Sequence, residues 1–127
     1  MDTERSAMIT VGGEEYALLL TTKATREIAG RYGGLENLGD KLMKSVNFEM
    51  AIAEIVWLIT LLANQSILVH NLKHKESPME LLTEDVVELL TTPADFGAYK
   101  SAITDALIKG TKRNVESEAD PKNAVVG

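Results

Sequence analysis

The sequence predicts a mainly α-helical protein: a small helical domain around a long central helix, with an N-terminal β-hairpin and a disordered acidic C-terminal tail. Three observations lead to this prediction. Residues 47–74 contain no proline or glycine, and their apolar residues recur at helical spacing. Two short β-prone runs flank Gly12 and Gly13, and residues 114–127 are polar without apolar periodicity. We therefore expect a single α-rich domain over residues 1–113 and a flexible tail over residues 114–127.

The first structured element is expected to be a hairpin over residues 8–20. The glycine pair in its middle supplies the positive φ angles that tight primed turns require. An isolated two-stranded hairpin is marginally stable in water. We therefore expect the hairpin to lie on the helices or to pair with another chain through its edge.

Two short helices are expected next, over residues 22–32 and 35–44. Thr21 and Thr22 can cap the first helix, and Gly33 and Gly34 end it, because glycine after a helix accepts the left-handed conformation. The second helix is amphipathic, and four of its apolar residues are expected to face inward: Leu35, Leu38, Leu42 and Met43.

The central helix is expected over residues 47–74, with Asn47 suited to be its N-cap. Apolar residues cover most of its circumference and leave a narrow polar arc that includes Asn64 and Asn71. A helix this apolar must be enclosed by other elements. Its most apolar part, residues 55–62, is shorter than the roughly 20 residues that cross a bilayer, so we expect a core helix and no membrane. Trp57, among aliphatic neighbours, is expected to be a core residue rather than an interface anchor.

Two further helices are expected over residues 83–90 and 93–112. Thr83 can cap the first helix, and acids follow in its first turn. Thr92 and Pro93 form a start signal for the second, a capping threonine followed by proline at the first helical position. The same segments allow a rival interpretation, in which residues 83–90 and 92–109 form the helix-turn-helix of a small regulatory or DNA-associated protein.

Composition and charge exclude several classes of protein. The chain has 127 residues, a formal charge of −6 and no cysteine, which excludes disulfides and cysteine-ligated metals. A nucleic-acid surface needs clustered lysine and arginine, and aromatic residues for base stacking make up only 5% of the chain. The first eight residues carry two acids and no apolar run, so no secretion signal is visible. We expect an acidic cytoplasmic protein that binds no nucleic acid.

No motif predicts catalysis, a metal site or a cofactor. His70 and His74 have the spacing that lets two imidazoles bind one metal, but a third ligand is missing, and cations suit the carbonyl end of a helix. The acid pairs at 14–15 and 84–85 lie beside a turn and in a first helical turn, where nothing desolvates them. The glycines match no phosphate-binding loop. We therefore expect a non-enzymatic protein that contacts other proteins.

Four strings carry a resemblance to a known family. They are ITVGGEEYALLLTTKATREI, RYGGLENLGDKL, NFEMAIAEIVWLITLLANQSILVHN and KGTKRNVESEADPKNAVVG, and together they span nearly the whole chain. In this order they resemble the tail assembly chaperones of long-tailed, siphovirus-type phages and prophages of Firmicutes. The hairpin-to-helix N-terminus, the RYGGLENL turn and the polar ending are the most telling pieces.

The resemblance implies a role in virion assembly in the bacterial host cytoplasm, and absence from the mature virion. Such chaperones bind the long helical tape measure protein, keep it soluble and help tail tube subunits assemble around it. The implied partners are therefore the tape measure protein and the tail tube protein. We also expect self-association into a homo-oligomer through the hairpin or the helix faces.

Apolar residues of the hairpin and the helices are expected to hold the partner. A hairpin edge can extend a sheet, and surplus apolar side chains can shield the apolar stripe of a partner helix. The candidate partner-binding residues are Ile9, Val11, Tyr16, Leu18, Leu20, Leu35, Leu38 and Leu89.

Overall fold

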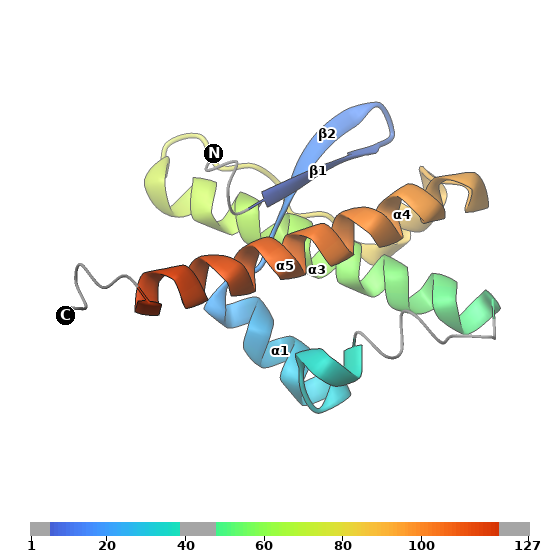
Figure 1. The fold of residues 1–127 in the computed structure, drawn as a ribbon. Helices are drawn as coiled ribbons and strands as arrows, with labels where there is room; N and C mark the ends of the chain where they lie inside the picture. Colours follow the sequence, from blue (N-terminus) through green and yellow to red (C-terminus); the bar gives the residue numbers. More distant parts are fainter. Residues whose placement is uncertain (1–5, 39–47, 120–127) are drawn as a thin grey trace.

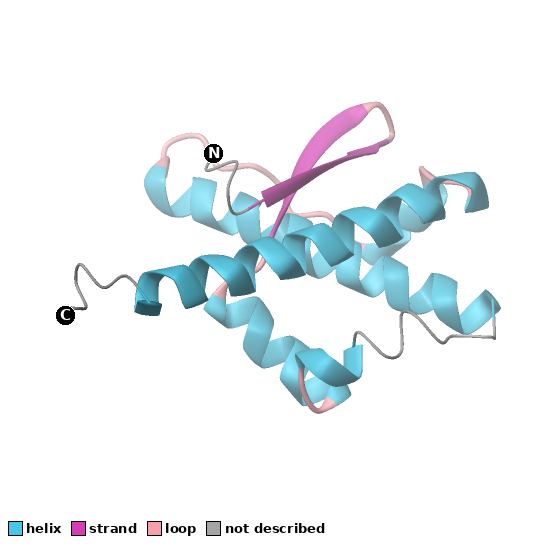
Figure 2. Cartoon of the chain, viewed as in Figure 1, coloured by secondary structure: helices cyan, strands magenta, loops and turns pink. Residues whose placement is uncertain are grey.

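The computed structural model describes residues 6–38 and 48–119, and in it a β-hairpin lies across two long helices (Figure 1). Helices form most of the described chain, and the hairpin supplies its two strands (Figure 2). The predicted fold class is confirmed in these features: a mainly α protein with a long central helix and an N-terminal hairpin. In chain order the elements are β1 (Ser6–Val11), β2 (Glu14–Leu19), α1 (Thr22–Tyr32), α3 (Phe48–Lys73), α4 (Glu84–Leu89), the 3-10 turn η1 (Pro93–Asp95) and α5 (Phe96–Ala119). Residues 35–38 are also helical.

The hairpin forms where the glycine pair predicted it. β1 and β2 pair antiparallel, in a register that runs from Ser6 opposite Leu19 to Val11 opposite Glu14. Gly12 and Gly13 have φ angles of 60° and 83°, which is the backbone that a two-residue primed turn requires.

Helices cover both edges of this hairpin. On the β1 side, Tyr99 Oη and Lys109 Nζ of α5 donate hydrogen bonds to backbone carbonyls of the strand. On the β2 side, Ser66 Oγ of α3 donates to the carbonyl of Ala17 at 2.9 Å. A strand from another chain would have to displace these bonds. The hairpin therefore lies on the helices, and the alternative expectation, pairing through a free edge, does not fit these contacts.

The core is built around α3. Leu58, Ile59 and Leu62 have no exposed surface, because the hairpin and α5 pack against this helix. The stretch Ala51–Lys73 is also long and apolar enough to cross a membrane by length and composition. The prediction from sequence considered residues 55–62 and therefore underestimated the length of the apolar stretch. Half of the apolar window is buried inside the fold, as expected for a core helix.

The last helix is longer than predicted. α5 continues to Ala119, so residues 114–119, assigned to the tail from sequence, are helical. Neither glycine nor proline occurs between Lys112 and Ala119, and glutamate and alanine favour helix. The rest of the predicted tail lies outside the described residues, as do residues 39–44 of the second predicted helix, with Leu42 and Met43, and Asn47.

Two glycines of α5 test how this helix packs. A Cβ atom on Gly110 would lie 2.8 Å from Leu20 Cβ, whereas a Cβ on Gly97 would meet nothing within 4 Å. We expect Gly110→Ala to lower the free energy of unfolding by roughly 1–3 kcal/mol through overpacking. Gly97→Ala should raise it by about 0.5–1 kcal/mol, because alanine favours helix over glycine. Urea unfolding followed by circular dichroism measures both, and equal stabilisation by the two changes would contradict this packing of α5 on Leu20.

Candidate partner-binding surface

Two asparagines of α3 hold the segment that leads into α4. Asn64 Nδ2 donates to the carbonyl of Leu82 at 2.8 Å, and the Leu82 amide donates back to Asn64 Oδ1 at 2.7 Å. Asn71 makes the same pair of bonds with Met79, at 3.1 Å and 2.8 Å. Each side-chain amide therefore satisfies both backbone polar groups of one residue, as a neighbouring strand would.

The spacing of these contacts explains the path of the segment. Asn64 and Asn71 are two helical turns apart, which is about 10 Å along the axis at a rise of about 1.5 Å per residue. Three steps of extended chain, from Met79 to Leu82, also cover about 10 Å. Residues 79–82 therefore run extended and antiparallel to α3. The predicted polar arc of the central helix is used for this attachment.

α4 follows directly and is fixed at both ends. Thr83 Oγ1 accepts a hydrogen bond from the Val86 amide at 3.1 Å, which confirms the predicted cap. Val87 is fully buried in the core, and Thr91 Oγ1 donates to its carbonyl at 2.6 Å. The helix is thus anchored by one buried residue and carries its other side chains on the surface.

Three of those surface side chains are large and apolar: Val86, Leu89 and Leu90, which we call the apolar α4 face. Their i, i+3, i+4 spacing places them on one side of the helix. Leu89 is 75% exposed. Among the described residues, the other exposed large apolar side chains are Met8, Leu72, Met79, Leu81 and Ile108. Exposed apolar side chains that cluster in this way are typical of binding surfaces.

The surface around this face is acidic. Glu84, Asp85 and Glu88, which we call the α4 acids, are all exposed. Residues 76–99 contain six acids and no lysine, arginine or histidine, so this stretch accounts for the formal charge of the whole chain. Negative charge of this density repels phosphates, which argues against the helix-turn-helix interpretation of the same residues.

The structure separates the predicted partner-binding residues into two groups. Tyr16 and Leu35 are half-buried against the core, and Leu89 is exposed. The remaining five are buried in the core of this chain and are not accessible to a partner, which corrects their assignment: Ile9, Val11, Leu18, Leu20 and Leu38. The inward side of the hairpin faces this chain's own α3 and α5, and apolar alternation cannot reveal which chain supplies the facing surface.

Val86 and Leu90 were not among the residues predicted to bind a partner. The signal was present as apolar pairs, Val86-Val87 and Leu89-Leu90. A helix of six residues resting on α3 can bury only one side. One member of each pair must therefore remain outside, and in the second pair both do.

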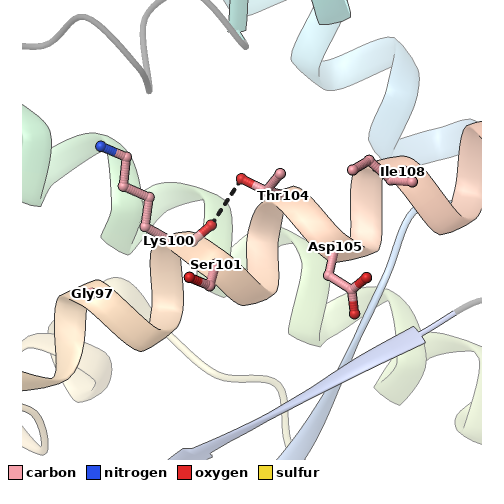
Figure 3. Close-up of a pocket in the computed structure, with 6 residues that line it drawn as sticks. All are labelled: Gly97, Lys100, Ser101, Thr104, Asp105 and Ile108. Carbon is pink, nitrogen blue, oxygen red and sulfur yellow. Dashed lines mark hydrogen bonds between the residues drawn. The ribbon is translucent and has the colours of Figure 1, made fainter.

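Other candidate sites have weaker chemistry. A shallow hollow of about 410 Å³ lies on α5, and Figure 3 shows its Lys100 and Asp105 side chains extending in opposite directions. The rings of His70 and His74 stack with centroids 4.6 Å apart. Among the described residues, no group of three histidine or acidic side chains could hold a metal ion. Neither place gathers converging polar groups of the kind that define a ligand site.

A polar cluster joins α1 to α3. Tyr32 Oη donates to Glu54 Oε1, and Arg31 Nε lies 3.4 Å from the same oxygen. The Arg31 guanidinium lies 4.2 Å from the centre of the Trp57 ring, an arrangement that favours a cation over an aromatic face. Trp57, predicted in the core, is half-buried against it. Burial, followed by the hydrogen bond to Glu54 and the charge of Glu54, raises the pKa of Tyr32 well above 10.

Comparisons with known proteins add no assignment. A scan of the sequence against models of protein families finds no match, and searches of curated proteins and of solved structures find none either. The functional interpretation therefore depends on the chemistry of this surface and on the resemblance described above.

The asparagine contacts predict a graded effect on stability. Asn64→Ala leaves the part-buried amide and carbonyl of Leu82 without partners, so we expect it to lower the free energy of unfolding by roughly 1–3 kcal/mol. Asn71→Ala is the matched control, because its bonds to Met79 are exposed and water can replace them. Urea unfolding compares the two variants. Equal losses would contradict a buried attachment at Leu82.

The raised pKa of Tyr32 predicts instability at high pH. The folded chain holds this proton more tightly than the unfolded chain, so the free energy of unfolding should fall as pH rises above about 10. Burial also raises the pKa of Tyr16 and Tyr99. Tyr32→Phe should therefore flatten the decline without abolishing it. Urea unfolding at several pH values measures the slope, and an unchanged slope in the variant would assign the decline to other groups.

Proposed function

We propose that this chain is a non-catalytic tail assembly chaperone of the siphovirus type. In this proposal it binds a helical, apolar segment of the tape measure protein, keeps that protein soluble and promotes assembly of tail tube subunits around it. The observation that carries the proposal is the exposed apolar α4 face, and the resemblance of the sequence to this family supplies the partner.

The chemistry of the α4 face suits this role. A tape measure protein exposes apolar helical stripes until tube subunits enclose it, and an apolar surface can shield such a stripe. Leu89 is 75% exposed, and full burial of a leucine contributes about 1.5–3 kcal/mol. A helix laid on Val86, Leu89 and Leu90 would bury apolar area on both partners.

The proposal includes a place and a time of action. The chaperone would act in the bacterial host cytoplasm during assembly, would self-associate when free, and would be absent from the mature virion. A small regulatory or DNA-associated protein remains the alternative function. The exposed α4 acids lie on the surface that such a protein would turn toward phosphates, so charge favours the chaperone.

Co-expression with the protein encoded just downstream of the gene tests the proposal. We expect a long partner that is insoluble alone to elute with this chain as a soluble complex in size-exclusion chromatography. Leu89→Ser should weaken the complex on the order of tenfold, since it removes a buried leucine contact.

Leu72→Ser is the matched control for this experiment. Leu72 is 72% exposed, nearly as much as Leu89, but lies at the end of α3. Its replacement should leave the complex unchanged. A downstream protein that is soluble alone and forms no complex would contradict the proposed function. Equal effects of the two substitutions would contradict the assignment of the surface.

A further inference from the structure

We propose that the occupant of the apolar α4 face is a basic amphipathic helix, with an apolar stripe flanked by lysine or arginine. The inference rests on the proposed function for the role of this surface, and it adds the chemistry by which the segment is chosen. Its basis is the distribution of charge, size and exposure around Val86, Leu89 and Leu90.

The excess negative charge of the chain lies in the stretch of sequence that contains this face. The six acids of residues 76–99 equal the formal charge of −6, and the rest of the chain contains thirteen acids and thirteen bases. The α4 acids occupy one flank of the helix, next to the exposed leucines on the helical wheel. A partner helix that covers the leucines brings its own flanks against these carboxylates, and cationic flanks make that approach favourable.

The hairpin turn borders the other flank of the face. A Cβ atom on Gly12 would lie 2.7 Å from Leu90 Cδ1, so the hairpin turn touches the edge of the apolar α4 face. Glu14 and Glu15 follow this turn and are exposed. The face is thus flanked by the α4 acids on one side and by the hairpin turn, which Glu14 and Glu15 follow in the chain, on the other.

A hollow on the Glu88 side of α4, lined by none of Val86, Leu89 and Leu90, has room for a long basic side chain. It measures about 270 Å³, below the roughly 300–1,000 Å³ of small-molecule sites. Ile52, Pro93 and Phe96 supply apolar walls, and Glu88 is the charged residue that lines it. A lysine or arginine can lay its aliphatic stem against such walls while its charged group meets a carboxylate.

Charge also argues against other occupants. A symmetric dimer formed through this face would bring the α4 acids of two copies together, and like charges at an interface are unfavourable. Nucleic acids and membranes with anionic lipids carry the same sign of charge as the face. A cationic partner helix is the occupant that gains from both the leucines and the acids.

Synthetic helices test this inference directly. Three fluorescent peptides of about eighteen residues are compared, since shorter isolated helices are marginal. One has leucines at i, i+3, i+4 spacing with lysine flanks, the second has the same leucines with glutamate flanks, and the third is the first with its order scrambled. Fluorescence anisotropy with the full chain measures affinity at about 50 mM and about 500 mM salt.

The basic amphipathic peptide should bind at least roughly tenfold more tightly than the other two. It should lose roughly tenfold in affinity at high salt, because the flanking pairs are exposed and screened. Neutralising the α4 acids together (Glu84→Gln, Asp85→Asn and Glu88→Gln) should weaken it by roughly tenfold. The control makes the same change of charge elsewhere (Glu27→Gln, Glu36→Gln and Asp105→Asn) and should change affinity by less than about twofold.

Several outcomes would overturn the inference. If the peptide with glutamate flanks binds as tightly as the basic one, charge does not contribute to recognition. If the scrambled peptide binds as tightly, the helical apolar stripe does not contribute. A stable dimer of the free chain that Leu89→Ser dissociates would assign the face to a second copy. If the neutralised variant does not fold, the comparison of the three peptides and the salt dependence with the unchanged chain still test whether the face prefers a basic amphipathic helix. Selective peptide binding without a complex with the downstream protein would instead reject the proposed function alone.

Discussion

The polar side chains of α3 determine how this protein is held together. The helix is too apolar to face water, and its few amides and hydroxyls bind the segments that cross it. Ser66 binds the carbonyl of Ala17 in the hairpin, Gln65 accepts a hydrogen bond from the cap residue Thr21 of α1, and Asn64 pairs with Leu82. Buried polar groups need such partners. Each contact therefore satisfies α3 and also fixes the position of a neighbouring element.

The position of α4 is a consequence of these contacts. The asparagines hold residues 79–82 along α3, and the buried Val87 attaches the short helix that follows. Six residues cannot enclose a core of their own. The remaining apolar side chains of α4 therefore stay on the surface, beside a dense group of acids. An exposed apolar face with carboxylates along its flank is suited to a partner with apolar residues and the opposite charge.

Much of the fold followed from local rules, and the surface did not. Gly12 and Gly13, the Thr83 cap and the uninterrupted apolar run of α3 predicted elements whose causes lie within a few residues. Ile9 and Val11 were assigned to a partner because period-two alternation marks a buried face but not the chain that buries it. Val86 was missed because exposure depends on how α4 rests on α3. The end of α5 was predicted too early because polar composition was taken as disorder, although neither glycine nor proline occurs in residues 112–119.

Hydrogen–deuterium exchange on the complex with the downstream-encoded protein tests the central claim, that the partner binds at α4. The account predicts that amides in residues 79–92 exchange more slowly in the complex than in the free chain. The hairpin, whose edge carbonyls already accept hydrogen bonds from α3 and α5, should change little. Slower exchange confined to residues 6–19, with residues 79–92 unchanged, would contradict the account and assign partner binding to the hairpin.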